Sequence, residues 1–400
     1  MASLEGPGLT ATRPKVLLAI TVYNGRTFVP RTVVSAARLS EAVADVDVVL
    51  LDDASPDTEF AEQLSDLATE LGIGYYRSPR NLGIVRNVNL GLLRSLDAGY
   101  DFVVVSNSDV VYPATMVDEM VRAMEADPNV GSVTAWSNNV SIYSLPNDDP
   151  DVYLSDQSVV DEITHDLTHQ FGTKTVDIPA GISFAMMIRR ETLQSVGLMD
   201  TVFGRGYCEE TDWSLRSVQA GWRLTLLPSV FVYHAGGGST VAAGMLTGGS
   251  TTVEANERII DHRYPDFRQQ VARFQGAGTV PDLVARALPA VVRGAASRHG
   301  LDVEIASVPR VPLADDPVVH ARIAADRHGV GLQVLYRGFR LDRPLEHPTQ
   351  AGAALVAMFP DVPVAAAVLR EPTPASRHAA QSLSSAGINV REAFSYPERV

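Results

Sequence analysis

Short groups of acidic and amide side chains follow apolar runs in the first part of the chain. Asp52-Asp53-Ala54-Ser55 follows one such run, and Asn107-Ser108-Asp109 follows another. A carboxylate at a strand end can accept hydrogen bonds from a base or a ribose, and near a diphosphate it can hold a divalent cation through oxygen. The same residue types also form turns and cap helices. Each group taken alone leaves the binding and structural interpretations open.

Two later groups could act on a substrate directly. Glu209-Glu210-Thr211-Asp212 places three acids at the start of a helical stretch, where one could be a general base for an acceptor hydroxyl. The helix dipole favours acids there for structural reasons as well. His234 ends an apolar run, where a neutral imidazole can bind a metal, although a histidine in that position is more often structural.

Residues 81–91 supply amide and guanidinium donors at the start of a predicted helix. Such a position suits a sugar or a phosphate, because free backbone N–H groups and the helix dipole both favour negative charge. A glycine turn followed by a capped helix would have the same pattern. This segment also leaves both interpretations open.

The elements that must position these residues alternate between strand and helix. Apolar runs predict buried strands at residues 15–21, 46–51 and 102–106, and further strands are expected at 73–77 and 130–135. Helical spacing predicts helices at residues 31–39, 58–71, 88–98 and 113–126. The alternation predicts an α/β fold with a mostly parallel, doubly wound sheet. Such sheets bind ligands at the carboxyl ends of their strands, where the polar groups lie.

The pattern divides the chain into four parts. Residues 1–13 are expected to be a disordered leader, 14–275 the main domain, 276–300 a linking helix and 301–400 a small C-terminal α/β domain. In the last part we expect helices at 317–327, 349–358 and 374–386 and strands at 332–336 and 362–368. Residues 138–175 are expected to be irregular, and the Gly- and Thr-rich residues 240–252 are expected to form a lid.

Composition excludes several classes of protein. The 400 residues carry a net charge of −14, and so acidic a chain is a poor candidate for nucleic-acid binding. No apolar stretch reaches the ~18–20 residues of a membrane span. The single Cys208 cannot form an internal disulfide, which fits a reducing compartment. We therefore expect a cytoplasmic protein, and peripheral contact with the inner face of the membrane is compatible with a lipid-linked substrate.

In this order and spacing, the groups resemble glycosyltransferase family 2, the inverting enzymes with the GT-A fold. Thr21-Val22-Tyr23-Asn24 is similar to the family's first-strand element, and Asp52-Asp53-Ala54-Ser55 to its nucleotide-binding "DD-x-S". The other matches are residues 81–91 with "N-x-G-x-x-x-x-x-N-x-G", 107–109 with the metal-binding "D-x-D", 180–200 with the segment before the acceptor site, 209–212 with "E-D-x-D" and 234–239 with "H-x-x-G-x-S". The resemblance is closest to bacterial rhamnosyl- and galactofuranosyltransferases and covers roughly residues 16–261.

The resemblance implies transfer of a hexosyl or deoxyhexosyl group, with inversion, from a nucleotide-diphosphate sugar (a UDP- or dTDP-sugar) to a glycan, lipid-linked or small-molecule acceptor. The implied donor nucleotide site comprises Thr21, Tyr23, Asn24, Asp52, Asp53, Asn81, Gly83, Arg86, Asn107 and Ser108. Asp109 and His234 are implied to hold a divalent cation, Mg²⁺ or Mn²⁺. Glu210 is the implied general base, with Glu209 and Asp212 as alternatives.

Two departures from the family pattern keep an alternative open. Asn107 stands where the first acid of "D-x-D" is expected, and Glu210 stands where the family has Asp. The alternative is a non-catalytic protein that binds nucleotide sugars or glycans through a degenerate transferase domain. A dehydrogenase is disfavoured because no G-x-G-x-x-G follows the first strand. For residues 301–400 we expect a role in homodimer formation or in positioning the acceptor.

Overall fold

A computed structural model of the chain describes residues 13–145, 155–236, 252–306, 318–326, 329–336 and 339–393. The chain forms two compact units, one made of Met1–Trp136 and Thr168–Ala277 and the other of Ser137–Leu167 and Gly278–Val400. Nearly all of the expected leader and of the expected lid at 240–252 lies outside the described residues. No helix in the described ranges has the length and hydropathy needed to cross a membrane.

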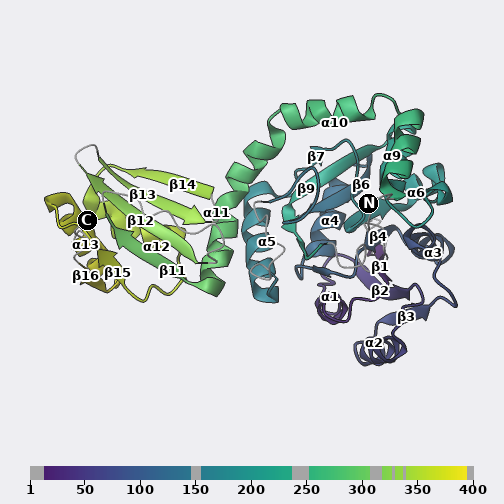
Figure 1. Ribbon diagram of the computed structural model, residues 1–400, viewed down its shortest axis with the longest axis horizontal. Coiled ribbons are helices and arrows are strands. Elements are labelled where there is room, and N and C mark those ends of the chain that lie inside the picture. Colours follow the sequence, from purple (N-terminus) through teal and green to yellow (C-terminus); the bar gives the residue numbers. More distant parts are fainter. Residues whose placement is uncertain are drawn as a thin grey trace, which may run out of the picture. The chain divides into compact units, whose positions relative to one another are not determined.

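The first unit is built on an eight-stranded sheet with the order β3-β2-β1-β4-β8-β6-β9-β7 (Figure 1). Its strands are β1 (Lys15–Val22), β2 (Asp45–Asp52), β3 (Gly74–Arg77), β4 (Phe102–Ser106), β6 (Val130–Trp136), β7 (Val176–Asp177), β8 (Ala185–Arg189) and β9 (Arg223–Phe231). β1 pairs in parallel with β2 and β4, and β2 with β3. β8 runs antiparallel to both β4 and β6. The expected mostly parallel sheet is confirmed, with the reversed strand β8 at its centre and a second reversed strand, β7, at its edge.

Helices cover both faces of this sheet. The helices of the first unit are α1 (Val29–Ala36), α2 (Thr58–Glu70), α3 (Ile84–Asp97), α4 (Met116–Ala126), α6 (Arg190–Val196), α7 (Glu209–Gln219), α9 (Thr252–Arg263) and α10 (Phe267–Gly276). α3 packs on β1, β2 and β4, α4 packs on β6 and β9, and Figure 1 shows the two helices on opposite sides of the central strands. Because both faces are covered, β4 and β6 are buried along their whole length, as their apolar runs predict.

One close approach fixes α3 on the sheet. A Cβ added at Gly91 would lie 2.6 Å from the Cβ of Ala19 on β1, so the second glycine of residues 81–91 lets helix and strand touch. The parallel register of β1, β2 and β4 then places the residues after each strand at one edge of the sheet. At that edge β5 (Val110–Val111) pairs antiparallel with β10 (Tyr233–His234).

The second unit contains a six-stranded sheet with the order β14-β13-β12-β11-β15-β16. Its strands are β11 (Leu301–Ile305), β12 (Val319–Asp326), β13 (Gly329–Tyr336), β14 (Phe339–Leu345), β15 (Ala367–Leu369) and β16 (Val390–Glu392). Its long helix is α11 (Thr279–His299), and α12 (Ala351–Met358) and α13 (Pro374–Ser385) pack on β13 and β12. The smaller C-terminal α/β unit is therefore present, and α11, which covers the residues expected to form a linking helix, belongs to this unit.

The structure differs from the expected elements in three places. Residues 317–327 were expected to be helical, but Val319, Ala321 and Ile323 are buried at alternate positions of the strand β12. The period of two, and not the helical period, decides this segment. The edge strand β14 has no counterpart in the expected set. The stretch expected to be irregular at 138–175 contains α5 (Gln157–Phe171).

Candidate active site

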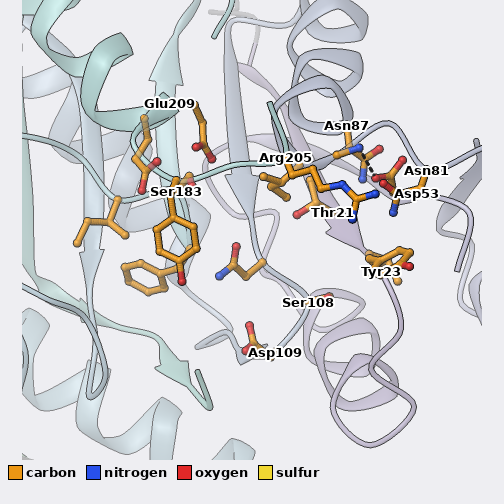
Figure 2. A pocket seen from close by; sticks show the side chains of 18 of the residues that line it. Thr21, Tyr23, Asp53, Asn81, Asn87, Ser108, Asp109, Ser183, Arg205 and Glu209 are labelled. Atoms are coloured by element: carbon orange, nitrogen blue, oxygen red, sulfur yellow. Dashed lines mark hydrogen bonds between the residues drawn. The ribbon is translucent and has the colours of Figure 1, made fainter. Parts of the chain in front are cut away.

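A pocket of about 290 Å³ lies at the carboxyl edge of β1 and β4. Eleven of the residues that the sequence singled out line it, namely Thr21, Tyr23, Asp53, Asn81, Gly83, Asn107, Ser108, Asp109, Glu209, Glu210 and His234. Figure 2 shows Thr21, Tyr23, Asp53 and Asn81 near one another, with Glu209 at the opposite end and Asp109 between the two ends. Four other candidates, Asn24, Asp52, Arg86 and Asp212, are not among the lining residues.

Asp53 is held in place by the loop that leads into α3. Its two carboxylate oxygens accept hydrogen bonds from the backbone N–H groups of Leu82 (2.6 Å) and Gly83 (2.8 Å). Burial raises the pKa of Asp53 above its ordinary value, and the two N–H donors limit that rise. A carboxylate with this fixed orientation can accept a further hydrogen bond from a ligand in the pocket.

The hydrogen bonds of Asp52 stabilise the fold around the end of β2. Its fully buried carboxylate accepts hydrogen bonds from the N–H and Oγ of Ser55 (2.9 and 2.7 Å) and from the hydroxyl of Tyr75 (2.8 Å), and it pairs with Arg77. Burial and the bond to Asp52 raise the pKa of Tyr75 to about 12. These contacts fix the turn after β2 and the neighbouring strand β3.

The candidates Asn24 and Arg86 lie outside the pocket for different reasons. Asn24 has a left-handed backbone (φ 59), and its N–H donates to Ser55 Oγ at 2.8 Å, which ties the ends of β1 and β2 together. Arg86 is exposed on α3. On the same helix Asn87 lines the pocket and donates from Nδ2 to the carbonyl of Leu51 (2.7 Å), while its buried Oδ1 has no partner within the described ranges.

The loop before α3 is closely packed at Gly83. Its φ is +82, and an added Cβ would lie 3.1 Å from both the carbonyl oxygen of Gly204 and the Cα of Arg205. We expect Gly83→Ala to destabilise the fold by about 1–3 kcal/mol, because alanine is strained at this φ. Since the N–H of Gly83 holds Asp53, affinity for the nucleotide that the family resemblance implies should fall as well. Urea denaturation and calorimetric titration would measure the two effects, and Gly99→Ala (φ +76, open space) is a control for the backbone strain alone.

Asp109 and His234 form a candidate metal site. The pairing of β10 with β5 places His234 Nε2 3.3 Å from Asp109 Oδ1 and 3.3 Å from Asn107 Nδ2. The ring of Phe184 stacks on the imidazole with centroids 5.5 Å apart. Asp109 Oδ1 is buried and accepts no hydrogen bond from any described residue. An orphaned carboxylate oxygen beside an imidazole fits a divalent cation.

The protein supplies only part of a coordination shell at this site. Within the described ranges, no cluster of three or more His, Cys, Asp or Glu side chains could hold a metal. A hard cation such as Mg²⁺ or Mn²⁺ at Asp109 and His234 would therefore take its remaining oxygens from a ligand or from water.

Glu209 and Glu210 begin α7 at the other end of the pocket. The Oε2 atom of each is buried and has no hydrogen-bond partner among the described residues. Burial raises the pKa of Glu209 well above its ordinary value, and the charge of Glu210 raises it further. Burial also raises the pKa of Glu210. The pKa values of two adjacent buried carboxyls depend on each other's charge. A carboxylate whose pKa is raised is a stronger base than a solvated glutamate.

Asp212 lies further along α7, and both of its carboxylate oxygens accept hydrogen bonds from other side chains. Its Oδ2 accepts from Arg216 Nε (2.8 Å), and its Oδ1 accepts from Arg263 Nη1 (2.7 Å) and from the Tyr264 hydroxyl (2.9 Å). The carboxylate is completely buried. These contacts join α7 to α9 and leave Asp212 away from the pocket.

Several lining residues were not among the candidates. Arg205 and Tyr207 come from the segment between the 3₁₀ turn η2 (Thr201–Phe203) and α7, and Figure 2 shows Arg205 beside Asp53 and Asn81. Ser183 and Phe184 come from the turn before β8. Arg205 stands between two glycines shortly before the acid group, and that pattern is the signal that could have identified it.

Part of the chain is similar to known glycosyltransferases. Residues 18–197 match the family model of glycosyl transferase family 2. The chain is 25% identical over 240 residues to undecaprenyl-phosphate mannosyltransferase of Micrococcus luteus, covering 58% of this chain and 89% of that protein.

Solved structures of low sequence identity are also similar. GalNAc-T7 with UDP, GalNAc and Mn²⁺ is 15% identical, with a TM-score of 0.44 over 56% of this chain and 44% of that one. A mannosyltransferase from Pyrobaculum calidifontis in complex with GDP-Man and Mn²⁺ is 18% identical, with a TM-score of 0.42 over 72% of this chain and 76% of that one.

Proposed function

Because residues 18–197 form a domain of glycosyl transferase family 2 on a GT-A type fold, we propose that the chain transfers a sugar from a nucleotide-diphosphate donor to an acceptor oxygen with inversion. One observation carries the proposal. A single pocket combines a fixed carboxylate at Asp53, the pair Asp109 and His234, and the carboxyls of Glu209 and Glu210, whose Oε2 atoms are buried. These three groups suit a nucleoside, a diphosphate and an acceptor, in that order along the pocket.

The nucleotide is assigned to the end of the pocket formed by Thr21, Tyr23, Asp53 and Asn81. Asp53 can accept an N–H or O–H from the nucleoside, because the loop before α3 holds its carboxylate in one orientation. The ring of Tyr23 offers an apolar face for a base. The guanidinium of Arg205 lies at the same end and adds positive charge to a strongly acidic pocket.

The diphosphate is assigned to Asp109 and His234. A divalent cation held there would neutralise the diphosphate and stabilise the departing nucleoside diphosphate. Asp109 offers its unpartnered Oδ1, His234 offers an imidazole nitrogen, and Asn107 contributes a neutral amide beside them. The stacked Phe184 limits how far the imidazole can turn.

Glu210 is the proposed general base. It takes the proton of the acceptor O–H, and the oxygen attacks the anomeric carbon from the side opposite the diphosphate. The bond from that carbon to the phosphate oxygen breaks, and the nucleoside diphosphate leaves with the electron pair. Glu209, whose pKa is raised by both burial and the charge of Glu210, carries a proton and keeps a second negative charge away from the base. Asp212 is assigned to the structure of α7 and α9.

A lipid-linked acceptor is the first to test, because the similar protein of Micrococcus luteus is named for undecaprenyl phosphate. A glycan acceptor is the second. An enzyme with the first kind of acceptor would work at the inner face of the membrane as a peripheral protein. The dimer or acceptor-positioning role expected for residues 301–400 stays a prediction.

Calorimetric titration with UDP, dTDP and GDP, with and without Mn²⁺, tests the nucleotide site. We expect one nucleotide to bind best and its affinity to fall in Asp53→Asn. If no nucleoside diphosphate binds to the folded chain under either condition, the proposed function is wrong. Binding without turnover in the presence of either acceptor would favour the non-catalytic alternative, for which Asn107 in place of an acid is the supporting observation.

Removing the proposed metal ligand should separate the diphosphate from the nucleoside. We expect Asp109→Asn to weaken Mn²⁺-dependent binding of the nucleoside diphosphate by about 10- to 100-fold. Binding of the matching nucleoside, which has no phosphates, should stay unchanged. An equal loss for both ligands would show that Asp109 supports the pocket as a whole and does not hold a metal.

A further inference from the structure

The connection between η2 and α7 has an unusual backbone. Tyr207 (φ 71) and Cys208 (φ 72) both lie in the left-handed region, next to Gly204 (φ 61) and Gly206 (φ 132). Residues with a Cβ rarely adopt this conformation, and they stay in it only where the surrounding structure stabilises them. We call residues 203–208 the turn before α7. Its conformation sets the direction in which α7 begins.

Asn256 of α9 binds this turn at three points. Its Nδ2 lies 3.0 Å from the carbonyl oxygen of Phe203, 2.7 Å from that of Gly206 and 3.0 Å from that of Tyr207. The amide has two hydrogens, so at least one is shared between two carbonyls. The side chain is 6% exposed, and its bonds gain strength from that burial.

The helix that carries Asn256 is itself anchored on the same region. Arg263 at the end of α9 pairs with Asp200 (2.8 Å) and with Asp212 (2.7 Å), and the Tyr264 hydroxyl donates to Asp212. These bonds fix α9, and with it Asn256, relative to α7. A displacement of the turn would therefore have to break the bonds from Asn256 to the three carbonyl oxygens.

The turn supplies or orients residues at both ends of the pocket. Arg205 and Tyr207 lie within it and line the pocket, and Glu209 and Glu210 follow it directly. The carbonyl of Arg205 also accepts from the N–H of Ile84 (3.3 Å), which joins the turn to the loop that holds Asp53. One amide side chain thus stabilises the strained backbone on which both ends of the pocket depend.

We propose that Asn256 is a positioning residue for transfer, which holds the turn before α7 in its left-handed conformation so that Arg205, Glu209 and Glu210 face the substrates. The proposal rests on the proposed function for its effect on turnover. It also has a consequence that does not depend on turnover. Without Asn256, the backbone of the turn should relax and its amides should exchange with solvent faster.

Asn89 provides a matched control. It is also a buried asparagine (7% exposed), and it bonds to the backbone just before η2, with both the carbonyl and the N–H of Met199. Met199 lies before the turn and outside the pocket. Asn256→Ala should lower kcat by about 10²-fold, because small displacements of reacting groups have effects of that size. Asn89→Ala should lower the melting temperature but keep kcat within a few-fold.

A second substitution tests the reason for the loss. Glycine adopts a positive φ without strain. Cys208→Gly in the Asn256→Ala background should therefore restore kcat by about 10-fold, whereas Asn256→Asp, which has no N–H donors, should resemble Asn256→Ala. Hydrogen exchange of residues 203–212 should speed up in Asn256→Ala and slow down again with Cys208→Gly.

The outcomes separate this proposal from the proposed function. If the wild-type chain transfers no sugar, the proposed function fails, and hydrogen exchange still decides whether Asn256 holds the turn. If the wild-type chain is active and folded Asn256→Ala retains its kcat, or if Asn89→Ala loses as much activity, the positioning role is overturned. Unchanged exchange of residues 203–212 in Asn256→Ala would overturn it as well.

Discussion

Replacing Glu210 by Gln should lower kcat by about 10²- to 10⁴-fold, the usual contribution of a general base, while donor affinity changes by no more than a few-fold. The reason is that glutamine keeps the shape of the side chain but cannot take a proton from the acceptor. Glu210 Oε2 is buried and has no partner among the described residues, so a lost structural hydrogen bond at that atom would not explain the effect. Steady-state kinetics together with calorimetric titration of the donor would measure both quantities.

Glu209→Gln is the matched variant for this prediction. A glutamine resembles the protonated acid that we assign to Glu209, so kcat should fall less than 10-fold. A large loss in Glu209→Gln with little loss in Glu210→Gln would exchange the two roles. Equal and small effects in both variants would show that neither carboxyl is the base.

The pH dependence has the same origin. The base must be ionised, and burial raises the pKa of Glu210, so kcat/KM should fall with decreasing pH at a value above the ordinary glutamate pKa of about 4.3. In Glu210→Gln this fall of kcat/KM at low pH should be absent. If kcat/KM of the wild-type enzyme falls only near the ordinary glutamate pKa, the base is a solvated carboxylate.

Asp212→Asn should produce the opposite pattern, a large loss of stability with activity retained in the folded fraction. The substitution removes the charge that faces Arg216 and Arg263. Breaking a buried ion pair costs about 3–5 kcal/mol, and we expect about 3 because both arginines are partly exposed to solvent. Urea denaturation would give the change in the free energy of unfolding, and Asp200→Asn, which removes a half-exposed partner of Arg263, should cost less. A stable but inactive Asp212→Asn would instead identify Asp212 as the base.

The strands that carry the site could be predicted from the sequence because burial on both faces leaves a simple signal. β1 (KVLLAITV) and β4 (FVVVS) are mostly apolar runs followed by polar residues, whereas β6 (VGSVTAW) is buried although it contains Ser132 and Thr134. The helix expected at 317–327 failed for a related reason. Its apolar residues also occur at helical spacings (318 and 321, 319 and 323), and the burial of alternate residues shows only once β12 pairs with β11 and β13.

The pocket was predicted less completely than the strands. Asp52 and Asp53 are equivalent in the sequence, but successive side chains after a strand point in opposite directions, so only Asp53 reaches the pocket. Asp212 lies three residues after Glu209 on the same helix, and helical periodicity cannot distinguish them. The partners that separate them are Arg263 at the end of α9 and Tyr264 directly after it, which sequence spacing does not bring close.

The central claim is that this pocket transfers a sugar from a nucleotide-diphosphate donor, and release of nucleoside diphosphate tests it most directly. The purified chain would be incubated with UDP-, dTDP- and GDP-sugars and Mn²⁺, with and without undecaprenyl phosphate or a glycan acceptor. We predict acceptor-stimulated release from one donor, with an inverted anomeric centre in the product, and, for an acceptor that attacks through a hydroxyl, loss of both in Glu210→Gln. Tight donor binding without release for any acceptor, or release that is unchanged in Glu210→Gln, would contradict the account.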